Sequence, residues 1–268
     1  MCLVIEIMDS PSAGTPTQLI VRGRVLEIAW WGPAVSSEPP IVLLHEGLGS
    51  VATWRDVPAA LAERTGCRVM AYSRFGHGAS DPLPSPRAVS FMHEEARLLP
   101  EILDAAGIAT ATLLGHSDGG SIALIAAAES ASRVHALILE APHVFVEDLS
   151  VQSIEQIRTT YFETDMRERL GRYHADADAV FLSWNDVWLH ADFRDWNLED
   201  YLPRVTCPVL LIQGERDEYG TLRQVETITT GVTGSVEALV LPQCGHSPHR
   251  DQRDHVIDAM AAFVSRVS

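Results

Sequence analysis

The chain has 268 residues, of which 46% are hydrophobic, and it carries a formal net charge of -16 at pH 7. A chain of this length and apolar content can bury a large core without disulfides or metal ions. The strong negative charge argues against binding to nucleic acid or to anionic membrane surfaces. No run approaches the roughly 20 apolar residues of a membrane span. These features favour a globular protein with one core.

The N-terminal stretch and the cysteines favour a reducing compartment. Residues 1–8 lack the basic start and the full apolar core of a secretory signal. The cysteines are scattered and lack the spacing of metal ligands, so we expect reduced thiols and a cytoplasmic protein. They are Cys2, Cys67, Cys207 and Cys244.

The order of apolar runs and breaks predicts strands that alternate with helices. Residues 18–31 contain two strand-like runs broken at residues 22–24, which is typical of a hairpin at the antiparallel edge of a sheet. After this hairpin the two kinds of element alternate, with strands expected over 41–45, 68–73, 109–114 and 134–139 and helices over 54–65, 91–106 and 121–128. This alternation predicts an α/β fold with a doubly wound, mostly parallel sheet of about eight strands.

The pattern changes over residues 144–203, where the β-rich runs disappear and the sequence becomes polar, acidic and aromatic. Helix-like stretches cover residues 154–173 and 179–189. A single ring in such a segment usually packs a helix onto a core, but together the rings predict a partly aromatic roof over a pocket, with Trp184 and Trp188 as candidates. The other rings are Tyr161, Phe162, Phe181, Phe193 and Trp196.

The alternation resumes after residue 203. Strands are expected over residues 208–212 and 236–241, with a helix over 221–230 between them and a last helix over 251–267. Because a single helix separates the two strands, the loops that follow them should leave the same edge of a parallel sheet.

The strongest chemical signal is the stretch Gly-His-Ser-Asp-Gly at residues 115–119. It joins a predicted buried strand to an Ala-rich helix. On such a tight turn Ser117 would project at the sheet edge, and the N–H groups of the helix start would point to where an oxyanion forms. The pattern alone is weak, since a Gly-rich turn with an N-cap serine has the same letters. His116 is a candidate pocket residue beside it.

A nucleophilic serine needs a base, and the base needs a third group that orients it. Asp217 follows the strand at 208–212, and His246 follows the strand at 236–241. Both loops are expected at the sheet edge that carries Ser117, so the three side chains can meet. Other titratable residues nearby remain as alternatives: Glu215 for the acid, and His249 and His255 for the base.

In these features the chain resembles the α/β-hydrolase fold family. The order Ser117, Asp217, His246 is the family's order of nucleophile, acid and base. Residues 43–50, Leu-Leu-His-Glu-Gly-Leu-Gly-Ser, resemble its His-Gly loop, and residues 73–81 are similar to its Arg-x-Gly-x-Gly-x-Ser-Asp loop. The resemblance implies a core formed by residues 1–143 and 204–268, with a helical cap inserted at residues 144–203.

One position departs from the family pattern. Counting back from Trp54, Glu46 lies where a glycine usually follows the histidine, and Gly47 lies at the oxyanion-donor position. The resemblance implies that the backbone N–H groups of Gly47 and Asp118 hold an oxyanion, with Leu48 as a second candidate for the first donor. Glu46 would then either bind a cationic or hydroxylated substrate group or face away and hydrogen-bond loop backbone.

The resemblance implies acyl transfer to water, with no metal or organic cofactor. His246 would take the proton of Ser117, and Asp217 would stabilise the imidazolium. We expect a small or medium carboxylic ester as substrate, and the residues do not indicate an oligomeric state. Thioesterase and lactonase chemistry remain open on the same fold.

Three further classes of function remain as alternatives. A carbon–carbon bond hydrolase of ring-cleavage products would need polar groups for a dienol carboxylate, for which cap arginines are candidates: Arg158, Arg167 and Arg194. A cofactor-independent oxygenase or perhydrolase could use the same triad. A ligand receptor that retains the triad is the non-enzymatic alternative.

Overall fold

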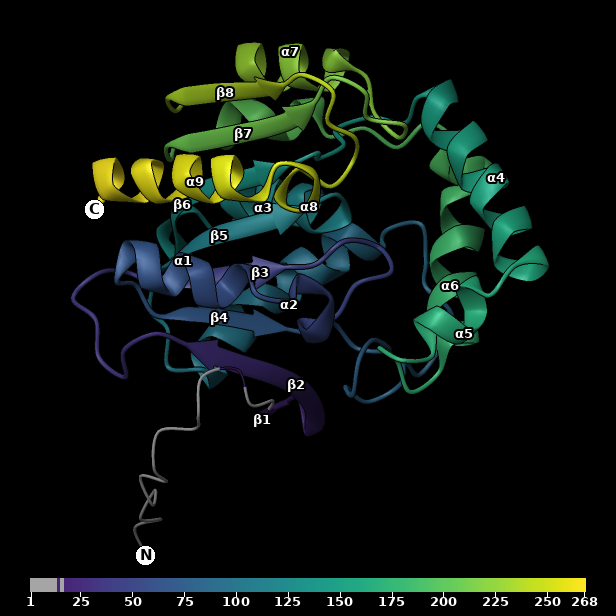
Figure 1. The fold of residues 1–268 in the computed structure, drawn as a ribbon, viewed down its shortest axis with the longest axis horizontal. Helices are drawn as coiled ribbons and strands as arrows, with labels where there is room; N and C mark the ends of the chain where they lie inside the picture. The colour runs from purple at the N-terminus through teal and green to yellow at the C-terminus, as the bar shows by residue number, and fades with distance from the viewer. Residues whose placement is uncertain (1–13, 15–16) are drawn as a thin grey trace, which may run out of the picture.

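The computed structural model describes residue 14 and residues 17–268. The stretch 1–8, expected to lack a signal, and Cys2 lie outside the described residues. Helices cover both faces of one sheet, and a further group of helices stands beyond the carboxyl ends of its parallel strands (Figure 1). In residues 17–268 no helix is both long and apolar enough to cross a membrane.

The sheet has eight strands in the order β1-β2-β4-β3-β5-β6-β7-β8. The pairs β1/β2 and β2/β4 are antiparallel, and the remaining pairs are parallel. The expected α/β fold with an N-terminal hairpin at the sheet edge is therefore confirmed. The strands are β1 (Thr17–Val21), β2 (Arg24–Trp31), β3 (Ile41–Leu44), β4 (Val69–Tyr72), β5 (Ala111–His116), β6 (Val134–Glu140), β7 (Val209–Gly214) and β8 (Val236–Leu241).

Two apolar cores lie on opposite faces of the sheet. One contains Leu61 and Met260, from the packed helices α1 (Val57–Thr65) and α9 (Arg253–Val267). The other contains Leu99 and Ile125, from α2 (Phe91–Ala105) and α3 (Asp118–Glu129). Every residue of β3, β4, β5 and β7 is buried, as expected for strands covered on both faces. The other elements of the core are α7 (Leu222–Gly231), α8 (Pro248–Asp251), η1 (Val51–Trp54) and η2 (Ala131–Arg133).

Several expected helices differ in their boundaries, including the stretch 154–173, which begins earlier, at Asp148, and is interrupted after Glu163. The helix predicted from Trp54 begins only at Val57, because Arg55 has φ 53° and ψ -118°, a conformation that no helix continues. The predicted last helix is divided into α8 and α9, since Gln252 between them has φ -133° and ψ 51°. Single backbone dihedrals of this kind leave no periodic signal in a sequence.

Residues 144–203 are helical, and we refer to them as the helical segment. It contains α4 (Asp148–Glu163), α5 (Met166–Leu170), α6 (Ala177–Trp188), η3 (Ala191–Phe193) and η4 (Glu199–Arg204). An isolated bridge between Phe145 and Asn197 joins its two ends. Helices α4, α5 and α6 stand beyond the carboxyl ends of the parallel strands, on the right of Figure 1. The loops after β5, β7 and β8 open toward them.

Candidate active site

The turn after β5 holds Ser117 in a strained conformation. Its φ is 54° and its ψ is -120°, a region that a residue with a side chain rarely adopts and that costs about 1–3 kcal/mol. The turn needs glycines on either side. A Cβ on Gly115 would lie 2.3 Å from the Gly119 carbonyl oxygen, and a Cβ on Gly119 would lie 2.0 Å from that of Leu44. The sequence therefore permits the close passage of strand and helix that projects Ser117 outward.

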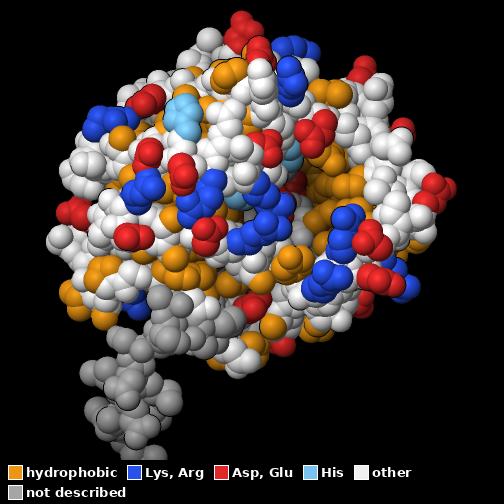
Figure 2. All heavy atoms as spheres, in the orientation of Figure 1, with side chains coloured by type: hydrophobic (Ala, Val, Ile, Leu, Met, Phe, Trp, Pro, Cys, Tyr) orange, Lys and Arg blue, Asp and Glu red, His pale blue; other side chains and the backbone are white. Residues whose placement is uncertain are grey.

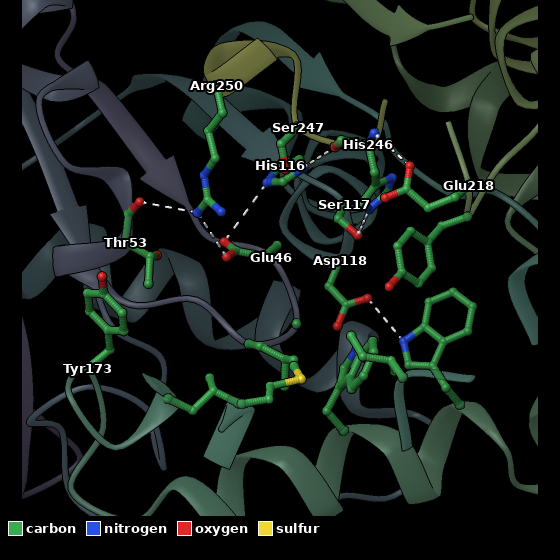
Figure 3. A pocket seen from close by; sticks show the side chains of 18 of the residues that line it. Glu46, Thr53, His116, Ser117, Asp118, Tyr173, Glu218, His246, Ser247 and Arg250 are labelled. Carbon is green, nitrogen blue, oxygen red and sulfur yellow. Dashed lines mark hydrogen bonds and ion pairs between the residues drawn. The ribbon is translucent and has the colours of Figure 1, made fainter. Parts of the chain in front are cut away.

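Ser117, His246 and Asp217 form a continuous hydrogen-bonded chain. The Ser117 hydroxyl donates to His246 Nε2 at 2.9 Å, and His246 Nδ1 donates to the Asp217 carboxylate at 2.8 Å. Asp217 is held in turn by the Gln213 side chain at 2.6 Å and by the backbone N–H of Tyr219 at 2.8 Å. Figure 3 shows Ser117 and His246 facing each other at one side of a pocket.

The alternative acid and bases lie elsewhere. His249 is buried in α8, where its Nδ1 is 2.9 Å from Glu140 Oε2. His255 is exposed on α9, and Glu215 is exposed in the loop after β7. None of the three is hydrogen-bonded to Ser117 or to His246 in the described residues. The geometry brings together only the first pair of candidates, Asp217 and His246.

The pKa of His246 is shifted in the opposite direction to those of the neighbouring His116 and His143. Burial alone would lower the pKa of His246, but the hydrogen bond and charge of Asp217 outweigh burial and raise it. His116 and His143 lie with ring centroids 5.3 Å and 5.7 Å from that of His246, and burial lowers the pKa of each to about 4. Near neutral pH, His116 and His143 are therefore uncharged, whereas His246 can accept a proton.

Side chains hold the loop after β3 in place by hydrogen bonds to its backbone carbonyl oxygens. Arg74 donates to the carbonyl oxygens of His45 and Glu46, each at 2.9 Å. The Nε2–H of His77 donates to the Gly47 carbonyl at 3.0 Å. In residues 17–268 no acceptor is found for the N–H groups of Gly47, Leu48 and Asp118. Gly47, Leu48 and Asp118 all line the same pocket as Ser117.

Glu46 faces into the site. Its Oε2 lies 3.9 Å from His116 Nδ1, and its Oε1 lies 3.7 Å from Arg250 Nη2 (Figure 3). Burial alone would raise the pKa of Glu46, but the attraction of His116, when it is protonated, and of Arg250 holds the pKa below its ordinary value. His116 in turn donates from Nε2 to the carbonyl oxygen of His246 at 2.6 Å. Glu46 thus lies beside His116, which supports the loop that carries His246.

Asp118 and two tryptophans from α6 close the other side. The Asp118 carboxylate is 1% exposed and accepts from Trp188 Nε1 at 3.2 Å, and burial raises its pKa. Trp184 packs against Gly47, since a Cβ built on Gly47 would lie 2.1 Å from Trp184 Nε1. The two indoles therefore contact the two residues whose backbone N–H groups are expected to donate to an oxyanion, Trp184 at Gly47 and Trp188 at the Asp118 side chain.

A pocket of about 380 Å³ lies between the core and the helical segment. Ser117 and His246 open into it. Its walls include the five expected pocket residues Glu46, Leu48, His116, Trp184 and Trp188. Further lining residues were not expected from the sequence, and they are Thr53, Arg55, His143, Ile157, Met166, Arg169, Leu170, Tyr173, Glu218, Tyr219, Ser247 and Arg250.

The other five aromatic residues that the sequence pattern singled out in the helical segment do not line this pocket, whereas Tyr173 does. Tyr161 stacks on Phe181 with ring centroids 3.8 Å apart, and Phe193 packs on Trp196 at 5.3 Å. Phe162 is 63% exposed. The four buried rings therefore have a packing role, as expected of single rings, and Phe193 also stacks on Phe91 of the core at 6.3 Å, whereas the exposed Phe162 does not fit that expectation.

The three cap arginines considered as carboxylate ligands lie outside the pocket. Each is paired with an aspartate of the helical segment: Arg158 with Asp186, Arg167 with Asp178, and Arg194 with Asp148. Arg169, which no sequence pattern singled out, lines the pocket instead. In residues 17–268 no group of three or more His, Cys, Asp or Glu side chains is placed to hold a metal ion.

Comparison with known proteins agrees with this architecture. The family model for the alpha/beta hydrolase fold matches residues 39–170. The human serine hydrolase BPHL is 28% identical over 189 residues, which are 68% of this chain and 64% of BPHL. A membrane phospholipase A, described as a bacterial virulence factor, superimposes with a TM-score of 0.75 at 20% identity, covering 94% of this chain and 86% of the other. The enol-lactonase from Burkholderia xenovorans LB400 superimposes with a TM-score of 0.74 at 20% identity, covering 93% of this chain and 100% of the other.

The family match, the sheet order and the turn at Ser117 define the class of protein: the chain has the α/β-hydrolase fold, and the model of that family matches just under half of it. Its match spans just under two thirds of human BPHL. It spans 34% of the mouse sn-1-specific diacylglycerol lipase ABHD11, which is 32% identical over 122 residues. The two superimposed structures share the fold with this chain.

Proposed function

We propose that the protein is a serine hydrolase that cleaves a small or medium carboxylic ester. The observation that carries the proposal is the hydrogen-bonded chain from Ser117 through His246 to Asp217, which opens into a pocket between the core and the helical segment. A serine activated by a base, with an oriented third group, is the arrangement that acyl transfer requires.

The first half of the reaction acylates the enzyme. As Ser117 Oγ attacks the ester carbonyl, its proton passes to His246 Nε2, and Asp217 stabilises the imidazolium. The backbone N–H groups of Gly47 and Asp118 hold the oxyanion of the tetrahedral intermediate. The C–O bond then breaks, and His246 returns the proton to the leaving alcohol.

The second half releases the acid. His246 takes a proton from a water molecule, whose oxygen attacks the acyl carbon, and the collapse of the second tetrahedral intermediate returns the proton to Ser117 Oγ. The raised pKa of His246 suits this exchange, because Asp217 stabilises the protonated form that must hold the proton between the two transfers.

The helical segment acts as a cap in this proposal. It contributes Ile157, Met166, Leu170 and both pocket tryptophans to the wall opposite Ser117. An apolar roof excludes water from the reacting carbonyl and strengthens the hydrogen bonds that hold the oxyanion. The volume of about 380 Å³ is at the small end of the range for ligand pockets, which favours a small or medium substrate.

Hydrolysis of 4-nitrophenyl esters with acyl chains of two to twelve carbons tests the proposal. We expect activity with an optimum at one chain length. Ser117→Ala should reduce kcat by at least about a thousandfold, because nucleophile and base act as one unit. Circular dichroism of the variant provides the control for folding. Undiminished activity in a folded Ser117→Ala protein would rule out this mechanism.

A further inference from the structure

Three arginines reach the pocket from three separate elements. Arg55 follows η1, Arg169 belongs to α5, and Arg250 belongs to α8. The whole chain has a net charge of -16. Three guanidinium groups on one pocket are a local concentration of positive charge in a strongly acidic protein, and Figure 2 shows basic side chains gathered around the hollow between the core and the helical segment.

The acidic side chains that line the pocket already have partners in the protein. Glu46 lies between His116 and Arg250, and the Asp118 carboxylate accepts from Trp188. The third, Glu218, accepts from the backbone N–H of His246 at 3.2 Å. Each of these side chains thus has a partner in the protein before a ligand enters, and the raised pKa of Asp118 shows that burial disfavours its negative charge.

Two of the arginines are not matched in this way. Arg169 has one exposed partner, Asp165, at 3.4 Å and one helical turn away, and such surface pairs are worth little. In residues 17–268 no ion pair or hydrogen bond is found for the Arg55 side chain. Arg55, without a partner in the described residues, and Arg169, with only a weak surface pair, are therefore available to an anionic ligand.

The lining residues near the catalytic histidine lie on a different side of the pocket from Arg250. Figure 3 shows Arg250, Thr53 and Tyr173 on one side and His246 and Glu218 on the other. Arg55 is next but one to Thr53 in the chain, and Arg169 lies one helical turn before Tyr173. Arg55 and Arg169 are thus close in the chain to residues on the side of the pocket away from His246, and the apolar side chains of Met166 and Leu170 also line the pocket.

We propose that the enzyme selects esters that carry an anionic group, a carboxylate or a phosphate, at the end remote from the scissile bond. Arg55 and Arg169 recognise that group through their planar guanidinium forks, which match both anions. Arg250 neutralises Glu46, which would otherwise repel the ligand. This inference rests on the proposed ester hydrolysis for the position of the scissile bond.

Three methyl esters with the same six-carbon acyl chain test it. Monomethyl adipate ends in a carboxylate, methyl 6-(phosphonooxy)hexanoate ends in a phosphate, and dimethyl adipate is the neutral reference. We would measure kcat/KM by acid release with the wild type, Arg55→Gln and Arg169→Gln, and Kd for each ester with Ser117→Ala. Arg97→Gln is the matched control, because Arg97 is exposed on α2, pairs with Glu129 at 3.6 Å and lies outside the pocket.

We expect the wild type to prefer one of the anionic esters over dimethyl adipate by about tenfold, and the preference to fall about three- to tenfold in Arg55→Gln and in Arg169→Gln. Arg97→Gln should keep the preference. The ratio between the carboxylate and the phosphate ester identifies the anion. Because each result is a ratio within one variant, partial loss of folded protein cancels.

Equal or better use of dimethyl adipate would overturn the inference, as would a preference that survives in both arginine variants. The proposed function fails in a different way. If no ester is hydrolysed but Kd still shows the arginine-dependent preference, anion binding stands and ester hydrolysis does not.

Discussion

At the scale of single residues, the site depends on one serine whose conformation few residues adopt. Ser117 has a positive φ, and the close approach of Gly115 and Gly119 to neighbouring backbone makes that turn possible. The sequence predicts this much, because a serine flanked by glycines between a strand and a helix has a specific meaning. The direction of the Glu46 side chain had no such signal, since it depends on Arg250 and His116, distant in the chain.

The pH dependence of hydrolysis should report His246. His246 must be neutral to act as base, and Asp217 raises its pKa above the ordinary 6.5. Activity should therefore fall as the pH drops through a midpoint above about 6.5. The charge of Glu46 contributes to this increase, so Glu46→Gln should move the acidic limb of kcat/KM to lower pH.

Glu215→Gln is the matched control for that shift, because Glu215 is exposed outside the pocket. A profile of kcat/KM against pH for the three proteins decides the matter. An acidic limb that stays in place in Glu46→Gln would show that Glu46 does not act on His246.

At the scale of elements, helix α6 and the loop after β3 depend on each other. Trp184 occupies the space where a side chain at position 47 would lie. The sequence predicted both the loop and an aromatic helical segment, but not their contact. Sequence periodicity predicts which face of a helix is buried only when that face is clearly apolar. Helix α5 has five residues, too few to show such a pattern. Arg169 was missed for the same reason.

Gly47→Ala tests this contact. The new Cβ would lie 2.1 Å from Trp184 Nε1, so either the loop or the indole must shift. We expect kcat to fall about tenfold or more because an oxyanion donor is displaced. Trp184→Leu in the same chain should restore part of the loss by making room.

Gly171→Ala is the control in the helical segment, since a Cβ there meets nothing closer than 3.4 Å. Kinetics of the single and double variants form a cycle with the wild type. Simple addition of the two single effects would contradict a direct contact between position 47 and Trp184.

At the scale of the whole molecule, the sequence specified the architecture well because an α/β sheet is built from local signals. Short buried strands such as β3 and β7 are continuous apolar runs, and the amphipathic helices between them have lengths that favour parallel crossovers. The pocket was less predictable, because its walls combine residues from the core and from the helical segment.

Stability should decrease in acid because several histidines are buried in the neutral form. The pKa values of His116 and His143 are lowered to about 4 by burial, whereas the unfolded chain binds protons near 6.5. Between those values the unfolded state holds more protons, so the free energy of unfolding falls as pH falls. Each histidine should cost about 2 kcal/mol by pH 5.

Urea unfolding at pH 7 and pH 5 measures this effect, with His255→Gln as the control because His255 is exposed on α9. His143→Gln should reduce the difference between the two pH values, whereas His255→Gln should leave it unchanged. Equal stability of the wild type at both pH values would contradict the neutral, buried state of these histidines.

The most direct test of the central claim is to trap the nucleophile. We would treat the protein with a fluorophosphonate, which forms a covalent adduct with an activated serine, and locate the adduct by peptide mass spectrometry. The account predicts a single adduct on Ser117, formed far more slowly in His246→Ala and absent in Ser117→Ala. An adduct on another residue, or equal labelling of Ser117 without His246, would contradict it.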